Sequence, residues 1–171
     1  LVKTQVDTLG GKIEIESEIN RGTTFTITLP TPRNVSKQIF FDSESAQIYY
    51  DADINNTVIV WKKNITGIEY RRAFQAVLYT LKTYNTPGWI ADLRLQGVVD
   101  DAEQFWFMST VIPEAVRCGL KRIAAVGFND PIRKSYYDRM IERTAEAGIT
   151  LKVFESLEAA VSWMEAFIQR N

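Results

Sequence analysis

The order of apolar runs from residue 47 onward constrains the fold of this chain more than any other feature. Short apolar runs suited to strands alternate with longer stretches whose apolar residues recur at helical spacing, in the order β-β-α-β-α-β-α-β-α. The runs over 88–95 and 121–128 are apolar almost throughout, which is typical of strands buried on both faces. Short connections between alternating strands and helices predict an α/β domain over 47–171, in which one mainly parallel sheet is flanked by helices and opened by an antiparallel hairpin.

Helix boundaries follow from capping residues and prolines. We expect a long helix from about Thr66 to Tyr84 and a helix over 100–118 that is interrupted or restarted at Pro113, because proline cannot donate a backbone hydrogen bond. Asp130 and Ser156 are predicted to cap the last two helices, since both precede amphipathic stretches.

Residues 1–30 follow a different pattern. Residues 1–9 indicate the end of a helix, which Gly10 and Gly11 stop, and the stretches 12–18 and 22–29 alternate in polarity like the two strands of a hairpin. A helix end and one hairpin are too little to fold alone, since an isolated hairpin is marginal in water. Prolines and small polar residues follow, and we assign 31–46 to a linker between this fragment and the α/β domain.

Composition excludes several function classes. The 171 residues carry a formal net charge of −1, which argues against nonspecific nucleic-acid binding because that needs a basic surface. The chain has no histidine and one cysteine, Cys118, so it lacks a phosphohistidine, an imidazole metal site and an internal disulfide. It has no apolar run of membrane-spanning length, and we expect it to be cytoplasmic without membrane insertion.

The opening segment resembles the C-terminal end of the ATP-binding domain of sensor histidine kinases. The resemblance rests on a helix ending in Leu9-Gly10-Gly11, on the strand from Ile13 to Ser17 and on the "GTTFTITLP" strand over 22–30, although Asn20 stands where the family usually has glycine. It implies that Gly22 and Thr23 are the remnant of a nucleotide site. The family's Asp-x-Gly-x-Gly loop is missing, so ATP and magnesium are expected only in a full-length parent kinase and no cofactor is expected here.

Residues 47–171 resemble the STAS/SEC14-like α/β domain, the fold class of bacterial anti-sigma-factor antagonists. The stretches that carry the resemblance are "TVIVWKK" (57–63), "GWIADLRLQGVV" (88–99), "IPEAVRCGLKRIAAV" (112–126) and "FESLEAAVSWM" (154–164). In the antagonist branch a phosphorylatable serine opens the helix after the second of these stretches. Carboxylates and no hydroxyl occupy 100–103 here, which puts that switch in doubt.

Candidate site residues lie where the central strand ends. Open α/β sheets place ligands at the carboxyl ends of their strands, so Asp92, Arg94, Asp100 and Asp101 are candidates for a ligand or partner crevice. The alternative is that Asp92 and Arg94 pair with each other and that the acidic residues only favour the start of a helix. The adjacent pair Tyr136-Tyr137 is a second candidate contact surface.

These observations lead to one functional hypothesis. The chain is predicted to be a non-catalytic regulatory or protein-interaction module of bacterial two-component signal transduction, at the C-terminus of a sensor histidine kinase. Its partner would be the upstream kinase domain or another protein, with a homodimer possible. The alternative is a small-molecule or lipid carrier of STAS/SEC14-like fold, which would need an apolar pocket of several hundred Å³.

Overall fold

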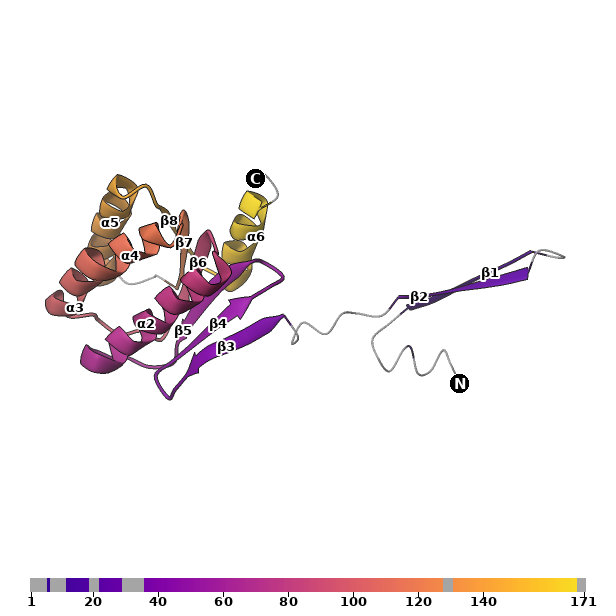
Figure 1. The fold of residues 1–171 in the computed structure, drawn as a ribbon, viewed down its shortest axis with the longest axis horizontal. Helices are drawn as coiled ribbons and strands as arrows, with labels where there is room; N and C mark the ends of the chain where they lie inside the picture. The colour runs from indigo at the N-terminus through magenta and orange to yellow at the C-terminus, as the bar shows by residue number, and fades with distance from the viewer. Residues whose placement is uncertain (1–5, 7–11, 19–21, 29–35, 128–130, 169–171) are drawn as a thin grey trace. The chain divides into compact units, whose positions relative to one another are not determined.

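The computed structural model describes residues 6, 12–18, 22–28, 36–127 and 131–168, and it divides the chain into two units, 1–35 and 36–171 (Figure 1). In the first unit, strand β1 (Lys12–Glu18) pairs antiparallel with strand β2 (Gly22–Thr28). This confirms the predicted hairpin, while the predicted helix end, Asn20 in the turn and the end of the second strand at 29–30 lie outside the described residues.

Most of the apolar side chains on one face of the hairpin are exposed, although Ile13 is partly buried. Ile13 pairs with Ile27 and Ile15 pairs with Phe25, so all four side chains project from one face. Ile15 and Phe25 are 60% and 62% exposed.

The second unit is built on one six-stranded sheet in the order β3-β4-β5-β6-β7-β8. The first two pairings are antiparallel and the last three are parallel. The strands are β3 (Lys37–Asp42), β4 (Ala46–Asp51), β5 (Asn56–Trp61), β6 (Gly88–Asp92), β7 (Arg122–Val126) and β8 (Thr150–Phe154). The helices are α2 (Gly67–Tyr84), α3 (Asp101–Trp106), η2 (Phe107–Val111), α4 (Ile112–Arg117), α5 (Pro131–Glu146) and α6 (Leu157–Ile168). The predicted α/β class and mainly parallel sheet are confirmed.

The predicted linker over 31–46 is wrong in its second half. Residues 37–42 form β3, which pairs with β4 at the edge of the sheet, so the second unit begins at Ser36 and not at residue 47. The alternation of polarity does not predict this strand, because a bulge between Ile39 and Phe41 breaks the alternation. Most side chains of β3 are also exposed, as expected at a sheet edge. Residues 31–35 lie outside the described residues.

Helices cover both faces of this sheet, and each face has its own core. From β5 to β8 every crossover moves one strand in the same direction, and right-handed crossovers then place the connecting helices on one face. Accordingly α2, α4 and α5 share a core cluster with alternate residues of the strands, such as Trp89 and Ala91 of β6. Ile90, between them, belongs to a second cluster with Ala160 and Met164 of α6. Helix α6 lies across the sheet from α2, α4 and α5 (Figure 1).

The helical run over 101–117 contains a widened turn. The segment η2 is π-helical, and the backbone N–H of Ile112 donates to the carbonyl of Phe107, five residues earlier. Pro113 follows directly, and its missing N–H and bulky ring disturb the preceding turn of an ordinary helix. The predicted interruption at Pro113 is thus a π turn inside a continuous helical run.

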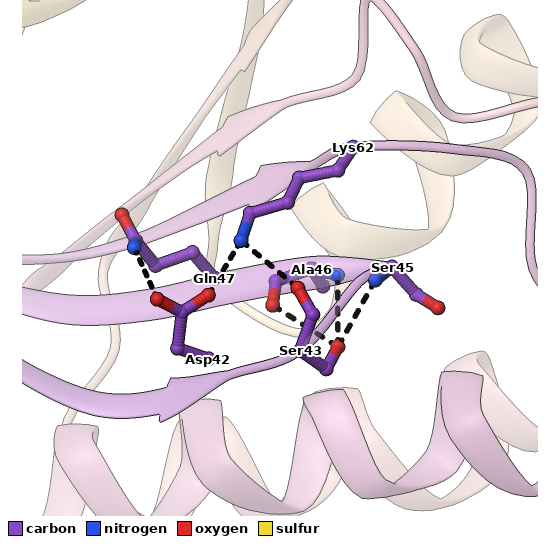
Figure 2. A network of polar contacts seen from close by, with 6 residues as sticks. All are labelled: Asp42, Ser43, Ser45, Ala46, Gln47 and Lys62. Atoms are coloured by element: carbon purple, nitrogen blue, oxygen red, sulfur yellow. Dashed lines mark hydrogen bonds and ion pairs between the residues drawn. The ribbon is translucent and has the colours of Figure 1, made fainter.

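A polar network closes the connection between β3 and β4 (Figure 2). The Ser43 hydroxyl accepts hydrogen bonds from the backbone N–H groups of Ser45 and Ala46, and the Lys62 ammonium donates to Asp42 and to the Ser43 carbonyl. Hydrogen bonds from Lys62 and then Gln47 lower the pKa of the Asp42 carboxyl. Lys62 follows β5, so the network ties the edge strand to the inner part of the sheet.

Candidate functional site

The central strand β6 ends in a buried carboxylate, Asp92, that forms an ion pair with Arg94. Asp92 is the last residue of β6, and its carboxylate accepts from Arg94 Nε at 2.9 Å and from Arg94 Nη2 at 2.6 Å. The Asp92 side chain is only 6% exposed, whereas that of Arg94 is 57% exposed. The hydrogen bond to Asp92 is the largest cause that raises the pKa of the Arg94 guanidinium. The alternative considered from the sequence, that the two residues pair with each other, is what the structure shows.

This pair is packed against the end of the neighbouring strand. Gly127 follows β7 with φ +100°, and a Cβ placed on it would lie 2.2 Å from Arg94 Cγ and 3.0 Å from the Arg94 backbone N. The Leu93 N–H also donates to the Val126 carbonyl at 2.9 Å. The loops after β6 and β7 are therefore held together, and the Asp92–Arg94 pair orients the first of them.

Asp100 has a structural role that its position explains. It is the N-cap of α3, and its carboxylate accepts from the Glu103 backbone N–H at 2.9 Å. The side chain of Glu103 is itself buried and accepts from Arg71 Nε at 3.1 Å, while the Arg71 guanidinium lies 5.2 Å from the ring centroid of Trp106. Asp100 and Glu103 thus fix the start of α3 against α2.

Asp101 differs from the other three predicted crevice residues. It is exposed in the first turn of α3 and lines a groove of about 180 Å³ between the α3–η2 segment and α5. The groove is lined by Asp101, Gln104, Phe105, Met108, Tyr136, Arg139, Met140 and Arg143. Neither Asp92, Arg94 nor Asp100 contributes to it, so the structure does not bring the four predicted residues into one crevice.

The groove combines a basic wall with an apolar floor. Arg139 and Arg143 are exposed and lie one helical turn apart on α5, and in the part of the chain that the structure describes neither forms an ion pair. Phe105 is 72% exposed and Met140 is 8% exposed. Burial raises the pKa of Tyr136 to about 12, against the opposing effect of the Arg139 charge, so this hydroxyl is protonated at neutral pH.

Sequence reasoning missed this groove because its two walls come from segments far apart in the chain. The only local signal is the four-residue spacing of Arg139 and Arg143. The prediction of an exposed Tyr136-Tyr137 pair is wrong for Tyr137, which is 7% exposed. Tyr136 is half-buried, and its ring lies edge-on to that of Tyr137 with the centroids 4.8 Å apart.

A second cavity lies inside the core and is small. It measures about 30 Å³, and apolar groups from the sheet and from α2 and α5 make up most of its wall. The Trp89 indole N–H is buried in this region without a hydrogen-bond partner, and Gln96 is 3% exposed. This volume is that of about one water molecule.

Gly22 and Thr23 begin β2. Gly22 has φ +108° and nothing within 4 Å of the position of a Cβ, and the Thr23 hydroxyl lies 2.9 Å from that of Ser17. Both residues are exposed. The turn that precedes them, 19–21, lies outside the described residues.

Nucleophile and metal chemistry find little support in the described residues. Cys118 is half-buried, and burial, followed by the Glu114 carboxylate, raises the pKa of its thiol, which disfavours the reactive thiolate. Over the described ranges no group of three or more Cys, Asp or Glu side chains is arranged to hold a metal ion. Among the same residues no helix is long and apolar enough to cross a membrane.

In comparisons with protein-family models and with curated proteins, the chain matches none.

Proposed function

We propose that residues 36–171 form a non-catalytic regulatory or protein-interaction domain of STAS-like fold at the C-terminus of a bacterial sensor histidine kinase. Residues 1–30 are then the end of that kinase's ATP-binding domain. The domain biases kinase activity in response to a ligand or partner, acting through the short segment that joins the two units.

The observation that carries the kinase part of this proposal is the exposure of three apolar side chains on one face of the β1–β2 hairpin, among the residues that the structure describes. Ile15, Phe25 and Ile27 are 60%, 62% and 48% exposed, and a two-stranded hairpin does not bury enough apolar area to be stable alone. If another protein domain packs on these side chains, it covers the apolar face and stabilises the paired strands. The ATP-binding domain that the sequence pattern resembles supplies such a body.

The regulatory part of the proposal is supported by the structural roles of three carboxylates in the second unit. Asp92 is neutralised by Arg94, Glu103 is neutralised by Arg71, and Asp100 caps a helix. These groups hold loops and helices in place, and none of these carboxylates is left poised as an acid or base next to an open cleft. The arrangement is that of a scaffold that presents surfaces to other molecules.

The carrier alternative requires a larger pocket than the cavity in the described core. A lipid or drug-sized ligand needs roughly 300–1,000 Å³ of concave space. The core cavity of about 30 Å³ is an order of magnitude too small. The described core therefore favours the interaction module over a carrier that encloses its cargo.

The test compares the full-length parent kinase with a variant that lacks residues 36–171. We expect deletion to abolish the signal dependence of autophosphorylation while leaving ATP binding intact. A second variant, in which an unrelated monomeric domain of similar size replaces 36–171, controls for the loss of bulk. Signal-dependent autophosphorylation that survives both changes would rule the proposal out.

A further inference from the structure

We propose that the groove between the α3–η2 segment and α5 binds a small amphipathic organic acid, an aryl or alkyl group that carries a carboxylate or a phosphate. The inference deepens the proposed function by naming the class of ligand that the regulatory domain takes. It rests on that function for its biological role, but the binding itself is measured on this chain alone.

The anionic end of the ligand follows from two arginines on α5 that form no ion pair with any side chain that the structure describes. Arg139 and Arg143 lie one turn apart on the same wall, and a guanidinium donates paired hydrogen bonds to carboxylate or phosphate oxygens. Other arginines of the unit, Arg71 and Arg94, are already engaged by buried carboxylates. Arg139 and Arg143, in contrast, line a groove, so a ligand in the groove meets two guanidinium groups.

The apolar end follows from the opposite wall and the floor. Phe105 and Met108 line the groove from the α3–η2 segment and Met140 lines it from α5. Thioethers adapt their shape to a bound group and make favourable contacts with aromatic rings. Phe105, 72% exposed, offers such a ligand a large uncovered ring.

Asp101 and Tyr136 orient the ligand. The Asp101 carboxylate repels an acid group from the α3 end, which directs that group toward the two arginines. The Tyr136 hydroxyl stays protonated and so remains a neutral donor to an anion. The groove volume of about 180 Å³ admits a small ring with its acid group and is too small for a lipid.

The π turn explains why the groove exists at this place. Met108 lines the groove and lies within the π-helical segment 107–111, where the angular spacing of side chains differs from that of an ordinary helix. Single π turns recur at binding sites for this reason. Pro113 keeps the turn in place, since it cannot complete an ordinary helical hydrogen bond.

The experiment titrates the full chain with phenyl phosphate, phenylacetate, phenol and inorganic phosphate, followed by amide chemical shifts. We expect the two aryl acids to shift amides in 101–108 and 136–143. Phenol and inorganic phosphate, which each lack one half of the ligand, are expected to bind at least about tenfold more weakly. Equal binding of phenol and phenyl phosphate would overturn the proposal, as would shifts confined to residues outside these two ranges.

Variants test the charge assignment in both directions. R139Q and R143Q together are expected to weaken phenyl phosphate binding by at least about tenfold, because both charged donors are lost. D101N is expected to strengthen it by about two- to fivefold, since an exposed like charge is removed. R72Q changes an exposed arginine on α2 that does not line the groove, and it is the matched control with unchanged affinity. Weaker binding in D101N, or undiminished binding in the double variant with its circular dichroism unchanged, would refute the site.

One further arm assigns the source of the acid. N-acetyl phosphotyrosine amide carries the same aryl phosphate on a peptide-like backbone. Tighter binding of this compound than of phenyl phosphate supports the site and assigns the acid to a partner's side chain, whereas weaker binding assigns it to a free metabolite. A failure of the kinase deletion test leaves these affinities unchanged, so the two proposals fail separately.

Discussion

At the scale of single residues, one glycine decides how closely two loops of the sheet approach each other. Gly127 combines a positive φ of +100° with contact to the backbone of Arg94, so it is constrained both by conformation and by space. Gly148, at the end of α5, has φ +78° but nothing within 4 Å of the Cβ position. Alanine at position 148 would therefore introduce backbone strain alone, whereas alanine at position 127 would introduce both strain and a steric clash.

We predict that G127A destabilises the domain by about 3–5 kcal/mol, because strain and backbone overlap add, whereas G148A costs about 1–2 kcal/mol from strain alone. Urea unfolding monitored by tryptophan fluorescence measures both values. Similar losses in the two variants would show that the loop carrying Arg94 moves aside, and that the approach of the two loops is not constrained.

Residue roles were only partly predictable from the sequence. The positions of Asp92 and Arg94 after an apolar run placed them correctly at the end of a central strand, and their mutual pairing was one of the two alternatives considered. Asp101 appeared equivalent to Asp100 in the sequence. Asp100 is a cap because it directly precedes α3, whereas Asp101 becomes part of a groove wall only because α5 forms the opposite wall.

At the scale of elements, the edge strand β3 is held by aromatic contacts that its own sequence does not reveal. Tyr84, the last residue of α2, stacks on Tyr50 of β4 with the ring centroids 3.8 Å apart, and its ring lies edge-on to Phe40 of β3 at 5.6 Å. Its hydroxyl also donates to Gln38 of β3. Alternation of polar and apolar residues predicts strands with one buried face, but β3 is mostly exposed. Its stabilising contacts come from Tyr84, more than forty residues later in the chain.

We predict that Y84L selectively loosens β3. Aromatic pairs contribute about 0.5–1.5 kcal/mol each beyond the area that they bury, and leucine keeps bulk while losing both ring contacts and the hydroxyl. Hydrogen exchange of amides in 37–42 is expected to accelerate, while exchange in β6 is unchanged. Y79L is the matched control, because Tyr79 is 60% exposed and has one ring contact with Phe40, at 5.8 Å. Equal acceleration in β6 would show that β3 unfolds only together with the whole sheet.

At the scale of the whole molecule, the two units differ in how much of their apolar surface they bury. The second unit has a covered core on each side of its sheet, whereas the hairpin of the first unit exposes its apolar face. The sequence predicted this contrast, because a helix end and one hairpin are too little to form a core. It misplaced the boundary, since an exposed edge strand leaves only a weak periodic signal.

This contrast predicts different behaviour for the full chain and for a chain that begins at Ser36. The shorter chain retains β3 and the Asp42–Lys62 network, so we expect its urea midpoint to match that of the second unit in the full chain. A chain that begins at Gln47 loses both features and is expected to unfold at lower urea. Light scattering should show the full chain self-associating with concentration through the apolar hairpin, while the chain from Ser36 keeps a constant mass. If each chain keeps its own monomer mass at every concentration, the hairpin face is already covered within the full chain. The apolar face would then no longer argue for a kinase domain that packs on it.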